Sequence, residues 1–240
     1  MRKRLLLPSA LVVFVCSLTG ACGSVPPEQR IDNVPMYGQP AVPRPDFLKR
    51  ADENFIRDAT AGVGSREKAS QLWAAKAKEH FKSGDFYNAM RRYNQSWLLD
   101  PNNHQPYWGF GQLMLVRSRY DEAIEYFEKA KSLIHDDYQK VALLADTAMA
   151  YGLKGNSLSP DQVEARSGFF ALANKNFVES TTMDEKYENS WRQWARSLYF
   201  EGKYAEAWEK VKKARSLGNG PFPGPPNFLK DLESKMPEPK

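Results

Sequence analysis

The chain contains three histidines and two cysteines, the side chains best suited to metal binding and nucleophilic chemistry. His80, His104 and His135 form no i, i+4 pair with one another or with a cysteine, the spacing by which a helix presents two ligands to one metal ion. The sequence has no Gly-rich phosphate loop, no nucleophile elbow and no HExxH string. We therefore predict no catalytic residues, no metal ligands and no cofactor, and a protein that is not an enzyme.

Cys22 closes a motif near the N-terminus that is suited to covalent modification. Arg2-Lys3-Arg4 is followed by a mostly apolar stretch, Leu5 to Leu18, which is too short to span a bilayer and is typical of an export signal. The next residues, Leu18-Thr19-Gly20-Ala21-Cys22, resemble the lipobox of bacterial lipoproteins, although Leu18 lies one place earlier than usual. The resemblance implies a signal peptide over 1–21 and a lipid on Cys22. An ordinary cleaved secretory signal is the alternative.

Cleavage before Cys22 would change both the number of cysteines and the net charge of the chain. Cys16 would be lost with the leader, so the mature protein would contain one cysteine and no intramolecular disulfide. Arg2, Lys3 and Arg4 supply three of the five net positive charges, which leaves +2 for the rest of the chain. Nucleic-acid binding needs a clustered basic face. We therefore predict no nucleic-acid partner.

A short phrase recurs in the chain at a step of 34 residues. Ala89 and Ala123 mark one step, and Ala173 and Ala207 mark another. A fixed period of this size indicates stacked copies of one small unit. The residues that fill the pattern in the three best units are Trp73, Ala77, Gly84, Phe86, Ala89, Tyr93 and Pro101; Tyr107, Phe110, Gly111, Tyr120, Ala123, Phe127 and Ala130; and Trp191, Ala195, Gly202, Tyr204, Ala207 and Ala214.

These units resemble tetratricopeptide repeats, with His135 where proline is usual and Val211 where an aromatic residue is usual. The resemblance implies an all-α fold, a right-handed α-α superhelix of four helical hairpins with terminal capping helices. The repeats would occupy 66–220. Small residues at the alanine and glycine positions would let two helices approach closely, while the large residues fill the space between them.

The third repeat carries an insertion near 156–168. Within it, Ser159-Pro160-Asp161-Gln162 reads as an N-cap, a first-turn proline and a capping-box glutamine. We therefore expect the second helix of this unit to start early, run long and bend near Gly168. The insertion is either a tolerated surface segment or a ridge that touches a partner.

The segments that flank the repeats differ from them in composition. Residues 22–45 are rich in proline and should form an extended tether, although residues 34–37 could instead lie on the domain surface. The apolar stripe of Phe47, Ala51 and Phe55 predicts a capping helix within 46–65. A proline-rich bend, a short helix and a tail should occupy 221–240, with the helix covering the last repeat.

In tetratricopeptide arrays the first helix of each unit lines a concave groove, and the resemblance assigns this role residue by residue. The candidate groove residues are Lys78, Phe81, Trp108, Gln112, Leu115, Met149, Arg192, Arg196 and Tyr199. An extended peptide with apolar anchors and carboxylates would suit such a surface. The alternative is that Phe81, Trp108 and Leu115 simply pack against a neighbouring helix. The lysine-and-asparagine clamp of some family members is missing, because Ala74 and Gly109 stand where it needs polar groups.

Together these features predict a membrane-anchored scaffold that binds a protein or peptide partner in the cell envelope. Gly23 after Cys22 resembles lipoproteins of the bacterial outer membrane, so we expect the domain to face the periplasm. The scaffold would dock subunits of an envelope assembly or a secretion process. The alternative function is a non-catalytic regulator of a cell-wall enzyme or another envelope enzyme.

Overall fold

A computed structural model describes residues 30–222 and 227–239 of the chain. This part is all helical, with ten α-helices, two short 3-10 helices and no strand, so the all-α prediction is confirmed. No helix in it is long and apolar enough to cross a bilayer. The predicted leader, Cys22 and Gly23 lie outside the described residues.

The helices follow one another with short connections. Their bounds are η2 Ile31–Asn33, η3 Pro35–Gly38, α1 Asp46–Val63, α2 Arg66–Lys82, α3 Phe86–Leu99, α4 His104–Val116, α5 Tyr120–Leu133, α6 Asp137–Ser157, α7 Val163–Met183, α8 Glu188–Glu201, α9 Tyr204–Leu217 and α10 Phe228–Lys235. Side chains cap several of them: Ser65 accepts from Lys68 N, and Asp85 accepts from Asn88 N.

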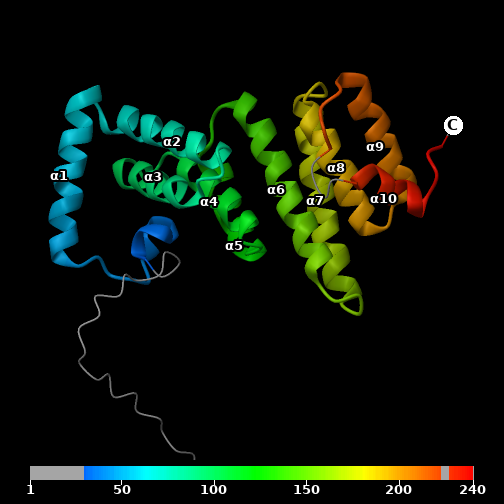
Figure 1. Cartoon of the computed structure of the whole chain (residues 1–240), viewed down its shortest axis with the longest axis horizontal. Helices are drawn as coiled ribbons and strands as arrows, with labels where there is room; N and C mark the ends of the chain where they lie inside the picture. The colour runs from blue at the N-terminus through cyan, green and yellow to red at the C-terminus, as the bar shows by residue number, and fades with distance from the viewer. Residues whose placement is uncertain (1–29, 223–226, 240) are drawn as a thin grey trace, which may run out of the picture.

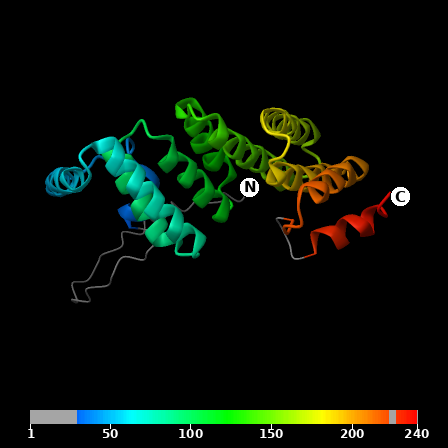
Figure 2. The ribbon, with the colours of Figure 1, turned by 90° about the horizontal axis from the view of Figure 1, so that it is seen from above.

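Consecutive helices pack in pairs, and the pairs lie beside one another in chain order. The pairs are α2 with α3, α4 with α5, α6 with α7 and α8 with α9. The first helices also contact one another, α2 with α4, α4 with α6 and α6 with α8. Figure 1 shows this succession along the long axis, with α1 at one end and α10 at the other, and Figure 2 shows it from above. The first helices thus form a continuous wall.

Two glycines of α4 explain how closely the helices approach. A Cβ added at Gly109 would lie 2.1 Å from Cζ of Tyr93 on α3, and one added at Gly111 would lie 2.4 Å from the ring of Phe127 on α5. Both rings are buried. Small residues at these places therefore leave the space that the large residues of the neighbouring helices fill.

In three of the four helix pairs, the turn between the two helices contains a residue in the left-handed backbone conformation. Gly84 has φ 80° before α3 and Gly202 has φ 86° before α9. Ser118 occupies the corresponding turn before α5 with φ 57°. A residue with a Cβ pays about 1–2 kcal/mol in this conformation, so the second pair carries local strain that the other two avoid.

The start of α7 differs from the prediction. Ser159 does not cap the helix, because residues 159–162 form a separate turn in which Ser159 N donates to Gln162 Oε1 at 3.1 Å and Gln162 N donates to Ser159 O at 3.0 Å. The helix begins at Val163 and continues through Gly168 as one α-helix. The side chains of Ser159 and Gln162 therefore bond within this turn, and no side chain caps the first turn of the helix.

The N-terminal strap, residues 30–44, lies on the domain and does not extend as a tether. Asn94, fully buried on α3, donates from Nδ2 to the carbonyl oxygens of Asp32 and Val34 at 3.1 and 2.9 Å. Arg117 donates to Oδ1 and the carbonyl oxygen of Asn33 at 2.7 and 3.1 Å. Tyr37 is buried, and this confirms the alternative that residues 34–37 lie on the domain surface. The tether prediction is therefore wrong for this part of 22–45.

The two terminal helices cover the ends of the array to different degrees. Phe228 and Leu232 of α10 are buried against a cluster that includes Leu198 and Trp208, and Trp208 Nε1 donates to the carbonyl oxygen of Met236 at 2.9 Å. At the other end, Phe55 of α1 packs edge-on against Trp73 at 5.6 Å between ring centroids. Phe47, in the first turn of α1, remains 66% exposed. Only the C-terminal half of the predicted α1 stripe is therefore used in packing.

Candidate partner-binding groove

Two neighbouring hollows lie along the wall formed by the first helices. The first has a volume of about 250 Å³ and is lined by Ala74, Ala75, Lys78, Tyr93, Gln105, Trp108, Gly109, Gln112 and Gln139. The second has a volume of about 230 Å³ and is lined by Phe81, Gln112, Leu115, Val116, Asp146, Met149, Gln193 and Arg196. Gln112 belongs to both, so the hollows are adjacent sections of one groove.

Asp146 of α6 holds this wall together. Its Oδ2 accepts from Trp108 Nε1 at 2.9 Å and from Gln112 Nε2 at 3.0 Å, both on α4. Its Oδ1 accepts from Gln193 Nε2 of α8 at 3.3 Å. Burial raises the pKa of this carboxyl group, while the three hydrogen bonds oppose the rise. One carboxylate thus joins three successive first helices.

Arg196 of α8 has the opposite situation. Its guanidinium makes no ion pair and no hydrogen bond with any residue of 30–222 or 227–239, and its enclosed Nε has no partner there. It lies 5.2 Å from the centroid of the Phe200 ring. Burial lowers the pKa of Arg196, because a positive charge loses water without gaining a carboxylate. The second hollow therefore contains an uncompensated cation.

The structure brings most of the predicted groove residues together. Lys78 and Trp108 line the first hollow, and Gln112 lies between the two hollows. The remaining members, Phe81, Leu115, Met149 and Arg196, line the second hollow. Phe81, Trp108 and Leu115 also pack against the buried core as partly buried side chains. The alternative that Phe81, Trp108 and Leu115 pack against a neighbouring helix is therefore correct for one side of each side chain. The other side faces a hollow.

Arg192 and Tyr199 do not belong to either hollow, which corrects two of the predicted positions. Arg192 is 4% exposed, donates from Nε to Glu188 at 2.6 Å and from Nη2 to the carbonyl oxygen of Gly218 at 2.9 Å. Tyr199 packs edge-on against Phe228 of α10 at 5.8 Å. Both side chains are occupied by the C-terminal segment and hold it on the last helix pair.

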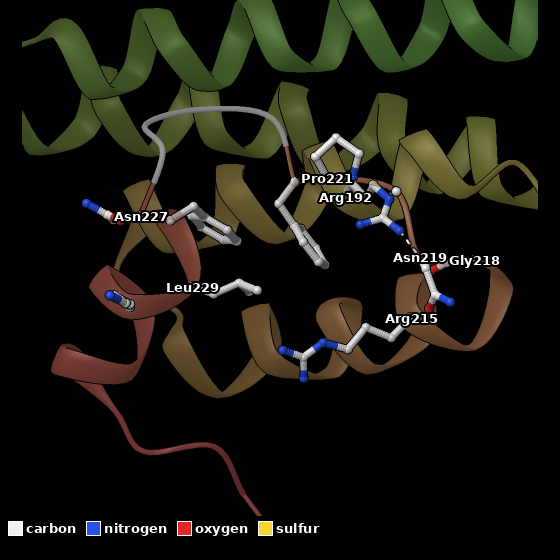
Figure 3. Close-up of a pocket in the computed structure, with 11 residues that line it drawn as sticks. Arg192, Arg215, Gly218, Asn219, Pro221, Asn227 and Leu229 are labelled. Atoms are coloured by element: carbon white, nitrogen blue, oxygen red, sulfur yellow. Dashed lines mark hydrogen bonds between the residues drawn. The ribbon is translucent and has the colours of Figure 1, made fainter.

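A larger hollow of about 680 Å³ lies between α8, α9 and α10 (Figure 3). Two of its cations, Arg192 and Arg215, are already paired within the chain: Arg192 with Glu188, and Arg215 Nη1 with Glu238 at 2.8 Å. The ring of Phe222 lies 4.5 Å from the guanidinium carbon of Arg192. These contacts show that the hollow lies where the C-terminal segment packs on α8 and α9. It is therefore a weaker candidate for partner binding than the groove.

Two of the histidines, His80 and His104, have separate side-chain partners in the structure. His80 Nδ1 lies 3.1 Å from Asp85 Oδ2, and His104 Nε2 lies 3.3 Å from Gln139 Oε1. Burial lowers the pKa of His104, which favours its neutral form. In the part of the chain that the structure describes, no three His, Cys, Asp or Glu side chains gather in a way that could hold a metal ion.

No known family model matches the chain, and no curated protein matches its sequence. The candidate site therefore depends on the residues and their geometry.

Sequence reasoning missed Asp146 and Gln193, which are central to the groove. A signal for the first was present, because Asp146 is the one charged residue between Val141 and Tyr151. An isolated acid in such a run is buried only where donors meet it. Its partners on α4 and α8 lie 38 and 47 residues away in sequence, so the pairing itself needed the structure.

Proposed function

We propose that this chain is a lipid-anchored tetratricopeptide protein of the bacterial envelope that binds a protein or peptide partner in its groove. In this proposal the four helix pairs form a right-handed superhelix, and Cys22 attaches the domain to the outer membrane, facing the periplasm. The protein acts by contact, without catalysis or cofactor, and supports an envelope assembly or a secretion process.

One observation carries the proposal: two adjacent hollows lie on a wall to which successive first helices contribute. Lys78, Gln112 and Arg196 come from α2, α4 and α8, so a single ligand lying in the groove would contact several repeats at once. Aromatic residues and arginine supply much of the binding energy of protein interfaces. Trp108 and Arg196 stand at the two hollows.

In-cell photo-crosslinking tests this function with the anchor intact. A photoreactive residue replaces Lys78 or Val116 at the two hollows, both of which are exposed. The matched control replaces Lys175, which is exposed on α7 and lines neither hollow. We expect one discrete protein adduct from the two groove positions and none from the control. Equal adducts from all three positions, or none from the groove, would remove the proposal.

A double substitution gives a second test. Trp108→Ala with Arg196→Glu should abolish capture of the crosslinked partner and preserve the helical circular dichroism. Full retention of capture would exclude the groove. If the captured partner is one stoichiometric enzyme whose turnover changes on binding, the regulator function replaces the docking function.

The anchor has a separate test. One acyl chain binds a membrane only marginally and two or three bind it durably, as each buried methylene contributes about 0.8 kcal/mol. Changing Cys22→Ser should leave the protein soluble or unprocessed in cell fractionation. A correctly processed serine variant in the membrane fraction would refute lipid anchoring.

A further inference from the structure

The second hollow combines an apolar lining with an unpaired guanidinium, and this combination specifies the chemistry of its occupant. We propose that it binds an extended internal segment of the partner in which an aspartate or glutamate lies two residues from a large apolar residue. The carboxylate pairs with Arg196, and the apolar side chain enters the hollow. This inference depends on the proposed function and specifies the ligand of the same groove.

The case for a carboxylate comes from the charges around the hollow. Arg196 has no ion pair or hydrogen bond within the described chain, and its Nε is enclosed. Asp146 also lines this hollow, but Trp108, Gln112 and Gln193 already donate to its two oxygens. A half-buried guanidinium without a counter-ion favours a ligand that brings one. A carboxylate can accept two parallel hydrogen bonds from it.

The case for an apolar neighbour comes from the lining. Phe81, Leu115, Val116 and Met149 are the apolar residues of the lining, and Val116 is 49% exposed. A volume of about 230 Å³ holds several water molecules at about 30 Å³ each, or one large side chain. Replacing that water with an apolar side chain is favourable by about 25 cal/mol for each Å² of apolar surface buried.

The spacing follows from an extended backbone. Residues i and i+2 of an extended segment face the same side, about 7 Å apart, whereas neighbours face opposite sides. The groove continues past Gln112 into the first hollow, where Lys78 is exposed. A segment that fills the second hollow therefore extends into the first, where Ala74 and Gly109 offer no polar side chain to hold a terminal carboxylate. This favours an internal segment over a chain end and places a second acidic residue near Lys78.

The experiment uses the purified full-length chain and two random peptide libraries. One library displays peptides within a carrier loop, and the other displays them with a free C-terminus. We expect selection from the loop library of Asp or Glu two positions from Leu, Phe or Met. Arg196→Gln should weaken the selected peptide by about tenfold or more, since charge-assisted pairs contribute about 1.5–3 kcal/mol. Arg196→Lys should weaken it less, because charge remains and the planar fork is lost.

Arg50→Gln is the charge-matched control, because Arg50 is exposed on α1 and lines neither hollow. Its binding should stay within about twofold of the native chain, and thermal unfolding should show that all three variants fold. The proposal is overturned if no peptide is enriched, if no acidic preference appears, if only free C-termini are selected, or if Arg196→Gln binds as tightly as the native chain. If Arg196→Gln binds the selected peptide as tightly as the native chain while groove crosslinks persist in cells, the proposed function stands and only this inference is refuted.

Discussion

The indole Nε1 of Trp108 donates to Oδ2 of Asp146 across 2.9 Å, joining two helices whose residues are 38 positions apart in sequence. Gln193 on α8 donates to the other oxygen of the same carboxylate. The spacing between α4, α6 and α8 along the groove therefore depends on one buried acid, and its substitutions are informative.

Asp146→Asn should maintain or increase the free energy of unfolding at neutral pH. An amide carries no charge to bury, and rotating the Gln193 amide by half a turn would let its Oε1, which now has no hydrogen-bond partner, accept from the new Nδ2. Asp146→Ala should instead lower it by about 1–3 kcal/mol, because buried donors lose their acceptor. Urea unfolding measures both. A larger loss for asparagine than for alanine would contradict this account.

The same residue should give the native protein a pH signature. The folded-state pKa of Asp146 is raised above the ordinary aspartate value of about 3.9, so the folded state binds the proton more tightly than the unfolded state between the two values. The contribution of Asp146 to stability therefore rises as pH falls through that window. The unfolding free energy of the native chain minus that of Asp146→Asn should therefore increase as the pH falls across this window.

Ser118→Gly should increase stability by about 0.5–1 kcal/mol, since it removes the strain of a left-handed serine and adds the smaller entropic cost of glycine. Gly84→Ser is the matched reverse change, because φ is 80° there and a Cβ would meet nothing within 4 Å. It should lower stability by a similar amount. Thermal unfolding measures both variants. Stability changes of the same sign in the two variants would show that the turn conformation is not the cause.

Gly111→Ala should destabilise the domain by about 1–3 kcal/mol, because its Cβ would overlap the buried Phe127 ring. Gly168→Ala on α7 is the control, since a Cβ there meets nothing within 4 Å. It should raise stability by about 0.5–1 kcal/mol through helix propensity alone. Denaturant unfolding that ranks the two variants the other way would contradict the packing described for α4 and α5.

Asn94→Ala should detach the N-terminal strap and leave the helix pairs intact. The carbonyl oxygens of Asp32 and Val34 lose their donor, which costs about 1–3 kcal/mol. Amide exchange over residues 31–38 should accelerate much more than exchange in α4 and α5. The control is Asn54→Ala, whose amide oxygen accepts from Arg57 on the same exposed helix. Unchanged exchange in the strap would show that other contacts hold it.

Arg192→Gln and Arg196→Gln should separate structure from binding. Arg192 is buried and bonded to Glu188 and Gly218, so its loss should cost about 2–3 kcal/mol of stability. Arg196 has no ion pair or hydrogen bond to lose within the described chain, so its loss should change stability by less than about 1 kcal/mol. Urea titration compares them, and a greater loss at Arg196 would indicate a structural role for that residue.

The helical pairs could be predicted because close helix packing demands small residues at fixed places, and Gly109 and Gly111 meet that demand against Tyr93 and Phe127. The groove stripes could also be predicted, because residues three and four positions apart lie on one face of a helix. Arg192 does not line the groove, because its guanidinium donates to Glu188, one turn earlier in α8, and to the carbonyl oxygen of Gly218. The spacing of Glu188 and Arg192 was a visible signal of that pair.

Other features could not be derived from local pattern. The strap has no helical periodicity, and its partners Asn94 and Arg117 lie 60 to 84 residues from the groups that they bind. The residue types of Ser159-Pro160-Asp161-Gln162 are common both in isolated turns and in helix N-caps. This sequence is therefore compatible with either structure. In each case the choice depends on tertiary contacts that no window of residues contains.

The docked strap also sets the height at which an anchored domain could stand. Eight backbone steps separate Cys22 from Arg30, the first described residue, and at about 3.6 Å per step they reach no further than about 29 Å. A lipid on Cys22 would thus keep the α3–α4 side close to the bilayer and limit how freely the array turns above it.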